Sequence, residues 1–469
     1  MEKTLSRRNF LRFTGMAAGA AALTACVPTP TPVPAAGEAT AAPTAAEVTA
    51  SAAVAGEAVT LRFRSWVSGQ TSPLDQAWYD WLTEHYSQDF NGSKIEFEFV
   101  PFGAEYIQKL LADAAAGSPP DLMDSSIIWA RDFYDRGVLL ELNEYLANVP
   151  EMQPDQYYGE STNIYRSKGG VYYGIPYWGP DSEVIATNAK LFKEAGLDPD
   201  GKDIVTWDDF VNAAKVLTKT EGDEIVQAGY MVPSFRYIEP FGTWMYTNGG
   251  ALHDDEITKP TFNNDKGVQV MQLHEDLLNK EKVSLPISPE RQDLELYLQG
   301  KVGMMLWGTW SPTYIAGNAP EGFDYRLILF PKGPQGDGKK LATTWSNMMV
   351  IPAKTKNPKA AFELAKYVST PPNVITRFEL SNRSAPIKAL YESEAWKKQL
   401  EKFPALAMIP KAAEVGGVYP FFPFFTEAND AIGTELEQIQ LGQKSIEEGL
   451  AEAERKVTEV IARRTTTIG

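Results

Sequence analysis

Strand and helix patterns alternate along the first part of the folded region of this 469-residue chain. Residues 59–66 alternate apolar and polar side chains, as a half-buried strand does, and residues 94–100 repeat that pattern. A helix pattern begins between them at Pro73 and carries apolar residues at every fourth position. Helix, short strand and helix patterns then follow at 104–116, 120–123 and 126–135. This order predicts a mainly parallel sheet covered by helices, the α/β class.

The rest of the chain continues the mixture of strands and helices. Thr206 and Asp209 resemble a capping box that opens a helix, and Gly442 is expected to break the C-terminal helical stretch at 427–462. Further strands are predicted at 184–187, 302–306, 325–330 and 343–351, and further helices at 189–195, 266–280, 294–299 and 358–369. No internal repeat at a solenoid period is present.

The first 26 residues resemble an export signal. Arg7 and Arg8 form a twin-arginine pair, a run of small apolar residues follows, and the segment ends in Leu-Thr-Ala-Cys at Cys26. The apolar run is about ten residues, too short to cross a bilayer as a mature helix. The pattern is similar to a bacterial lipoprotein signal, whose cleavage would leave Cys26 as the lipid-bearing first residue. Cys26 is the only cysteine, so the stability of the mature chain is expected to come from a hydrophobic core.

Residues 27–57 are rich in Pro, Thr, Ala and Val, with almost no charge and no aromatic side chain. Such a segment cannot bury enough surface to offset its chain entropy, so we expect a disordered tether between the lipid and the folded body. The formal net charge of the whole chain is −17. This balance argues against nucleic acid or anionic lipid as a direct surface partner.

Several short motifs follow one another along the folded region. They are YGIP at 173–176, LFKEAGL at 191–197, TWDDF at 206–210, NGG at 248–250, GKVGM at 300–304 and NPKAA at 357–361. In this order and spacing they resemble the family 1 extracellular solute-binding proteins of ABC importers, the maltose-binding-protein-like group. The resemblance covers essentially the whole chain from residue 59.

The resemblance implies a two-lobed periplasmic-binding-protein-like fold, with two mainly parallel sheets flanked by helices and three hinge crossings. The crossings are expected at 176–184, 302–308 and 345–351, the first lobe at 59–178 plus 305–346, and the second lobe at 183–302 plus 350–469. A ligand would sit between the lobes, which close on it by hinge motion. The implied partners are a solute and the permease of an ABC importer. We expect a monomer that lies outside the cytoplasm and touches the membrane only through its lipid anchor.

Candidate binding residues are those that follow predicted strands, because open α/β sheets bind ligands beyond the carboxyl ends of their strands. They are Trp66, Asp124, Ser125, Trp178, Asp181, Trp244, Tyr246, Trp307, Trp310 and Trp345, to which the family resemblance adds Arg383. We expect Trp244 and Tyr246 in a glycine-rich loop. Indole rings pack on the flat C–H faces of sugars, and carboxylates accept hydrogen bonds from their hydroxyls. The set therefore predicts a mono- or oligosaccharide ligand.

Each candidate has a plainer alternative. A loop tryptophan can instead fill a hinge or an interface, Asp124 and Asp181 can cap helices, and Arg383 can form an ordinary surface ion pair. The three histidines lie outside any His-Glu-x-x-His pattern, and no Gly-x-Ser-x-Gly elbow or phosphate loop occurs. Residues 198–201 resemble a calcium loop, but the glycine comes too early and the final Glu is missing, so we expect a simple turn.

These features predict a binding protein with no enzymatic activity, no metal and no cofactor. The main alternative is a secreted carbohydrate-active hydrolase or lyase, because two carboxylates beside a glycosidic bond cannot be excluded by counting acidic residues. Another alternative is an anchored adhesion or sensor module.

Overall fold

The computed structural model describes residues 57–67, 73–158, 170–286, 293–310, 312, 315, 318–418, 422 and 424–465. The predicted twin-arginine signal at 1–26, Cys26 and the tether up to residue 56 lie outside the described residues. The prediction of lipid attachment therefore stays a prediction.

Strands form a continuous hydrogen-bonded path in the order β2-β1-β3-β9-β4-β7-β6-β5, with β10 beside β9 and β8 beside β4. Their bounds are β1 (Thr60–Ser65), β2 (Lys94–Phe99), β3 (Leu122–Ser125), β4 (Ile175–Asn188), β5 (Lys219–Glu221), β6 (Glu224–Met231), β7 (Val302–Gly308), β8 (Tyr325–Ile328), β9 (Ala342–Val350) and β10 (Gly416–Val418). Seven of these strands were predicted, β1 to β4 and β7 to β9, with shifts of a few residues at most ends, although β4 begins nine residues before its predicted start at 184; β5, β6 and β10 were not foreseen.

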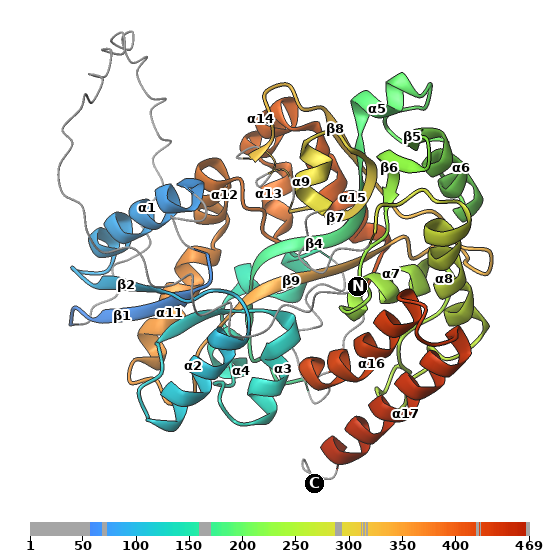
Figure 1. Ribbon diagram of the computed structural model, residues 1–469. Coiled ribbons are helices and arrows are strands. Elements are labelled where there is room, and N and C mark those ends of the chain that lie inside the picture. Colours follow the sequence, from blue (N-terminus) through green and yellow to red (C-terminus); the bar gives the residue numbers. More distant parts are fainter. Residues whose placement is uncertain are drawn as a thin grey trace, which may run out of the picture. The chain divides into compact units, whose positions relative to one another are not determined.

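Parallel pairs lie toward the two ends of this path, and antiparallel pairs lie in its middle. Strand β1 pairs in parallel with β2 and β3, and β6 pairs in parallel with β7. Strand β4 pairs antiparallel with both β9 and β7, and β9 pairs antiparallel with β3. The long strands β4 and β9 run side by side and join the two groups of strands (Figure 1). This is the α/β architecture that the sequence predicts, but its two groups of strands are joined in one continuous sheet with antiparallel pairs in the middle, and they do not form two separate, mainly parallel sheets.

Helices cover the sheet on both sides of this junction (Figure 1). They are α1 (Pro73–Asp89), α2 (Ala104–Ala115), α3 (Ile127–Asp135), α4 (Asn143–Leu146), α5 (Ala189–Glu194), α6 (Trp207–Leu217), α7 (Ile238–Thr247), α8 (Asp265–Glu275), α9 (Asp293–Leu298), α11 (Pro358–Ser369), α12 (Pro371–Ser381), α13 (Lys388–Glu392), α14 (Glu394–Lys402), α15 (Met408–Val415), α16 (Phe425–Gln440) and α17 (Ile446–Thr465). Thr206 and Asp209 form the predicted capping box of α6. Gly442, at φ 66°, lies in the predicted break between α16 and α17. No helix within the described ranges is long and apolar enough to cross a membrane.

Core packing places two segments differently from the predicted lobe boundaries. Phe362 and Leu364 of α11 share a hydrophobic core with Leu61 and Phe63 of β1, so this helix belongs with the N-terminal strands and not with the second lobe. Strand β8 pairs with the same part of β4 that pairs with β7, so β8 does not belong with the first lobe. The sequence could not show this because the chain changes sides within β9, a continuous strand with no turn residue to mark the crossing.

Candidate functional site

A cavity of about 600 Å³ lies beside the junction strands β4 and β9. Its volume falls in the range of small-molecule sites. The lining combines aromatic, acidic and small polar side chains from segments that are far apart in the sequence. The lining residues are Trp66, Phe102, Ser126, Ile127, Ile128, Asp181, Glu183, Pro233, Ser234, Tyr237, Glu239, Pro240, Asp293, Leu306, Trp307, Trp310, Trp345 and Asn347.

Three indole rings form one wall of this cavity. The ring centroids of Trp307 and Trp310 are 6.2 Å apart, and those of Trp310 and Trp345 are 5.5 Å apart. Gly308 makes room for this arrangement, because a Cβ atom at that position would lie 1.9 Å from Cζ3 of Trp310. All three rings are partly exposed, so their faces are available for stacking against a ligand.

Trp66 and Phe102 form a second aromatic surface. Their ring centroids are 5.5 Å apart with the planes nearly perpendicular, and Phe102 is 55% exposed. Trp66 follows β1 directly and also contacts the ring of Trp178 at 5.4 Å. Trp66 therefore stands where the strand-end argument predicts a ligand-facing side chain.

Two carboxyl groups of β4 project into the cavity from alternate positions of the strand. Asp181 accepts a hydrogen bond from the Nδ2 atom of Asn347 at 3.3 Å, and burial raises its pKa to about 6 against the opposing field of Arg383. Glu183 accepts hydrogen bonds from the hydroxyl groups of Thr243 and Thr343. These bonds hold both carboxyl groups in place before any ligand arrives.

Trp178 and Arg383 lie in a small hollow beside the cavity, which Asp181 and Trp310 also line. The guanidinium of Arg383 lies 5.3 Å from the centre of the Trp178 ring and binds the carboxylate of Asp75 through Nε and Nη2, at 3.2 and 3.1 Å. The plainer alternative for Arg383, an ion pair, is therefore present. Trp178 is only 7% exposed and supports Trp66 from behind.

Asp124, Ser125 and Tyr246, like Trp178 and Arg383, lie outside the cavity lining. Asp124 and Ser125 are buried within β3, where Asp124 accepts a hydrogen bond from the hydroxyl of Ser65. Burial raises the pKa of Asp124 to about 7. Tyr246 lies beneath Lys340, whose Nζ is 4.9 Å from the ring centre. These positions make Asp124, Ser125 and Tyr246 part of the protein's interior and surface packing.

The position of Trp244 differs most clearly from the one that the sequence predicts. It does not lie in a glycine-rich loop but on α7, and it is fully buried. Its ring packs against Phe330 and His274, with centroid distances of 5.1 and 5.0 Å. A ligand cannot reach such a side chain without unfolding the surrounding core, so Trp244 is a packing residue.

Several lining residues were not foreseen, among them Glu183, Glu239, Asp293 and Phe102. Glu183 could have been found, because it lies two residues after Asp181 on one strand and therefore shares its face. Glu239 and Asp293 lie in the first turns of α7 and α9, and only the tertiary fold brings these helices to the cavity.

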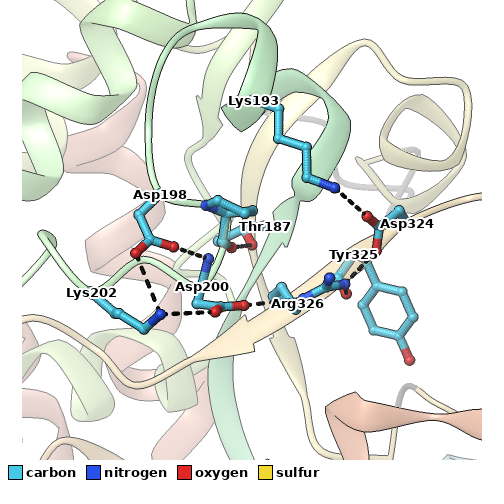
Figure 2. Close-up of polar contacts among 9 residues, drawn as sticks. Thr187, Lys193, Asp198, Asp200, Lys202, Asp324, Tyr325 and Arg326 are labelled. Carbon is cyan, nitrogen blue, oxygen red and sulfur yellow. Dashed lines mark hydrogen bonds and ion pairs between the residues drawn. The ribbon is translucent and has the colours of Figure 1, made fainter.

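The turn at 198–201 is occupied by ion pairs rather than arranged around a metal ion (Figure 2). Oδ1 of Asp198 accepts a hydrogen bond from the backbone N–H of Asp200, and Lys202 pairs with both carboxylates at 3.6 and 3.2 Å. Nε of Arg326 lies 3.1 Å from Asp200. Within the described ranges, no group of three or more acidic, His or Cys side chains is arranged to hold a metal ion.

The sequence profile of the bacterial extracellular solute-binding proteins matches residues 68–375. The chain therefore belongs to this family, which acts outside the cytoplasm. An arabinooligosaccharide-binding protein of Halalkalibacterium halodurans is 28% identical over 234 residues, which are 49% of this chain and 49% of the length of that relative. A binding protein of Brucella abortus is 23% identical over 401 residues, 84% of this chain and 91% of the relative.

Solved structures share the fold over most of the chain. An ABC transporter solute-binding protein from Thermotoga lettingae with bound α-D-tagatose has a TM-score of 0.72 at 23% identity, covering 86% of this chain and 100% of that one. The GacH receptor of Streptomyces glaucescens, solved unliganded and with acarbose, has a TM-score of 0.73 at 19% identity, covering 87% and 99%. UgpB from Mycobacterium tuberculosis in complex with glycerophosphocholine also reaches 0.73, at 18% identity with coverage of 87% and 99%.

Proposed function

We propose that this protein captures a mono- or oligosaccharide in the cavity beside β4 and β9 and delivers it to the permease of an ABC importer. The observation that carries the proposal is the combination of the indole wall, Trp307, Trp310 and Trp345, with the carboxyl groups of Asp181 and Glu183. Stacking surfaces and fixed hydrogen-bond acceptors are the two elements that recognition of a sugar requires.

The ligands of the relatives support a saccharide and also suggest a second class of ligand, a phosphodiester. One relative is an arabinooligosaccharide-binding protein and two were solved with α-D-tagatose and acarbose, whereas UgpB was solved with glycerophosphocholine. A phosphodiester carries a negative charge, which proteins usually bind with Arg, Lys or helix N-termini. The described lining of this cavity contains carboxyl groups, and it also contains the N-terminus of α3 at Ser126, so the binding test below includes both kinds of ligand.

We propose further that ligand capture closes two lobes around the cavity by hinge motion. One lobe would combine the elements around β1 to β3 with α11 and α12, and the other the elements around β5 to β8 with α16 and α17. Strands β4 and β9 would serve as hinge segments, because β9 pairs with β3 of the first group, β4 pairs with β7 of the second, and the two strands pair with each other.

We also propose that the protein acts as a lipid-anchored monomer, exported by its twin-arginine signal and attached through Cys26. Metabolic labelling with a radioactive fatty acid tests this in cells that express the full chain. We expect label in the wild type and none in the Cys26→Ser variant, and equal labelling of the two chains would exclude attachment at this residue.

A thermal-shift screen over neutral mono- and oligosaccharides tests the function itself. A ligand that binds only the folded state at a free concentration 100 times its Kd adds about 2.7 kcal/mol to the free energy of unfolding. We expect a rise in Tm for at least one saccharide, with glycerophosphocholine as the comparison ligand. A rise with glycerophosphocholine alone would contradict the proposal, and release of smaller sugars from a bound oligosaccharide would favour the hydrolase alternative.

The Trp345→Ala variant tests the indole wall. We expect at least about tenfold weaker binding of the saccharide found in the screen, because a stacked ring contributes about 1 kcal/mol in addition to its buried area. Trp81→Ala is the matched control: Trp81 lies on α1, stacked on Trp78 at 5.3 Å and outside the cavity lining. Isothermal titration should show unchanged affinity for the control, and equal affinities of both variants would remove Trp345 from the site.

A further inference from the structure

Arg383 is held beside the ligand cavity by the carboxylate of Asp75. Nε of Arg383 lies 3.2 and 3.3 Å from the two oxygens of Asp75, and Nη2 lies 3.1 Å from one of them. Asp75 is only 3% exposed and belongs to the first turn of α1. A charged pair with several hydrogen bonds of this kind fixes both the position and the plane of the guanidinium.

The fixed guanidinium supports an aromatic stack that ends in the cavity. Its carbon atom Cζ lies 5.3 Å from the centre of the Trp178 ring, within the range of a cation–π contact. The Trp178 ring meets the ring of Trp66 nearly at a right angle, with 5.4 Å between the centroids and 87° between the planes. Trp66 lines the cavity, whereas Trp178 and Arg383 do not. Arg383 therefore acts on the ligand-facing indole of Trp66 through the ring that lies between them.

The same arginine shares a small hollow with Asp181, the residue that lines both this hollow and the cavity. The volume of the hollow is about 20 Å³, which is about the room of one water molecule. Solvent screens charges in such a partly buried place only weakly. Burial raises the pKa of Asp181 to about 6, and the field of Arg383 opposes this rise. Without the arginine, the carboxyl group of Asp181 would keep its proton up to a higher pH.

We infer that Arg383 is a positioning residue of the binding site, which holds the indole of Trp66 in place and keeps Asp181 as an ionised acceptor without touching the ligand itself. The inference rests on the proposed function, since it concerns the same cavity. It makes the Asp75–Arg383 pair part of ligand recognition, although neither side chain lines the cavity.

The pH dependence of binding reports on this role. Hydrogen bonds from sugar hydroxyls to an ionised acceptor are about twice as strong as those to a neutral one. Affinity should therefore be highest above about pH 6 and fall as the pH drops through that value. The other titratable groups around Asp181 are Glu183, Glu239 and Asp293 in the cavity lining, Asp75 behind Arg383, and Tyr391 of α13. They are common to the wild type and the Arg383 variants, so a shift between the two pH profiles isolates the arginine.

Isothermal titration between about pH 5 and pH 8 compares the wild type with Arg383→Gln and Arg383→Lys. The probes are glucose, galactose, and α1–4- and β1–4-linked glucose oligosaccharides, of which the one that binds most tightly is used throughout. We expect Arg383→Gln to bind about tenfold more weakly at about pH 7 and to lose affinity from a higher pH onward. Arg383→Lys should restore the wild-type pH profile but not the full affinity, because an ammonium lacks the planar fork that binds Asp75.

Arg131→Gln is the matched control. Nε of Arg131 likewise lies 2.8 and 2.9 Å from the two oxygens of Asp135, and its side chain is 28% exposed against 25% for Arg383. Arg131 lies outside the cavity lining and outside the hollow, so this variant should keep both the affinity and the pH profile. Asp181→Asn should show no fall in affinity near pH 6, because the titrating group is absent.

Several results would overturn the inference while leaving the proposed function in place. They are a wild-type pH profile in Arg383→Gln, equal losses of affinity in Arg383→Gln and Arg131→Gln, or persistence of the fall near pH 6 in Asp181→Asn. Arg383→Lys carries the test alone if Arg383→Gln does not fold, since wild-type affinity in the lysine variant would itself contradict the inference. Failure of every saccharide to bind the wild type would overturn the proposed function and the inference together.

Discussion

The buried carboxyl group of Asp124 offers a sharp test of the structure through the Asp124→Asn variant. One of its oxygens, Oδ2, accepts a hydrogen bond from Ser65, while Oδ1 is buried with no hydrogen-bond partner among the described residues. Burial raises its pKa from an ordinary value of 3.8 to about 7. At about 1.4 kcal/mol per unit of pKa, this is a difference of about 4 kcal/mol between the protonated and ionised forms in the folded state.

The sign follows from proton linkage. Between about pH 4 and pH 7 the folded state holds this proton while the unfolded state has released it, so the free energy of unfolding falls as the pH rises. The stabilising contribution is present in full below pH 3.8 and is lost as the pH passes through 7. Asparagine has nearly the same shape but does not titrate, so the advantage of Asp124→Asn over the wild type should grow across this window to a few kcal/mol.

Other groups around Asp124 affect its pKa but are shared by both proteins, so they largely cancel in the difference. The charged and titratable neighbours are Arg377, Asp75, Arg383, Tyr79, Tyr106 and Tyr177. Urea denaturation at about half-unit steps between about pH 4 and pH 8, with linear extrapolation to water, measures the difference. Parallel stability curves for the two proteins would refute the argument that this carboxyl group holds its proton in the folded state.

Asp121→Asn is the matched control, because Asp121 is also buried but its carboxylate is fully engaged. It accepts hydrogen bonds from the backbone N–H of Arg62 at 2.9 Å, from Thr355 at 2.5 Å and from Asn357 at 3.2 Å. Replacing one acceptor oxygen by an N–H₂ donor would place donors against donors, which costs about 1–3 kcal/mol. At neutral pH, Asp124→Asn should therefore raise the free energy of unfolding, whereas Asp121→Asn should lower it.

Further predictions concern the core and the indole wall. Trp244→Ala should lower the free energy of unfolding by about 3–5 kcal/mol, because it leaves a cavity in the core, and it should not change the affinity of the folded protein for its ligand. Denaturation measures the first effect and titration the second. Weaker binding without loss of stability would show that Trp244 contacts the ligand. Gly308→Ala should displace the Trp310 ring, since the new Cβ would lie 1.9 Å from it, and weaken saccharide binding about tenfold; unchanged affinity and tryptophan fluorescence would show that the ring does not depend on this glycine. Burial lowers the pKa of His274 to about 4, so the free energy of unfolding should fall by up to about 3 kcal/mol as the pH falls from 6.5 to 4. This dependence on pH should be absent in the His274→Phe variant. If the variant shows the same dependence, other groups cause it.

Local signals explain what the sequence predicted well. The capping box of α6 needs only Thr206 and Asp209, three residues apart, and both reciprocal hydrogen bonds are present. The break before α17 needs only a glycine that can adopt positive φ, as Gly442 does. Such features depend on neighbours in the sequence, so they can be identified without knowledge of the tertiary fold.

Helix α7 shows where local signals fail. The sequence analysis expected a glycine-rich loop here, and the segment does contain Pro240, Gly242 and Thr243, which are poor helix formers in isolation. In the structure, most of its side chains are buried, so tertiary packing compensates for the weak propensity. The error then carried over to Trp244, because a side chain expected on a loop was also expected to face a ligand.

Long-range pairing was equally inaccessible from the sequence. The insertion of β9 between β3 and β4 joins residues more than 150 positions apart, and no local pattern specifies that order. The packing of α11 beside β1 and the pairing of β8 with β4 depend on long-range contacts of the same kind. By contrast, Trp66 and Trp307 could be placed beside the cavity because the rule on strand ends requires only that the strand itself be recognised.

The pairing of β4 with β9 gives the site a rigid centre. Asp181 lies directly opposite Trp345 in the antiparallel register, and Glu183 lies opposite Thr343. Because side chains alternate along each strand, Trp345 and Asn347 share one face of β9, so a slip of one residue would remove both from the cavity. The hydrogen-bond ladder therefore fixes the distance between the stacking ring and the acceptor carboxyl group, independently of how the more distant walls move. A small ligand that touches only this pair should thus lose affinity in Trp345→Ala as severely as a longer one, whereas residues on the outer walls should matter only for longer ligands.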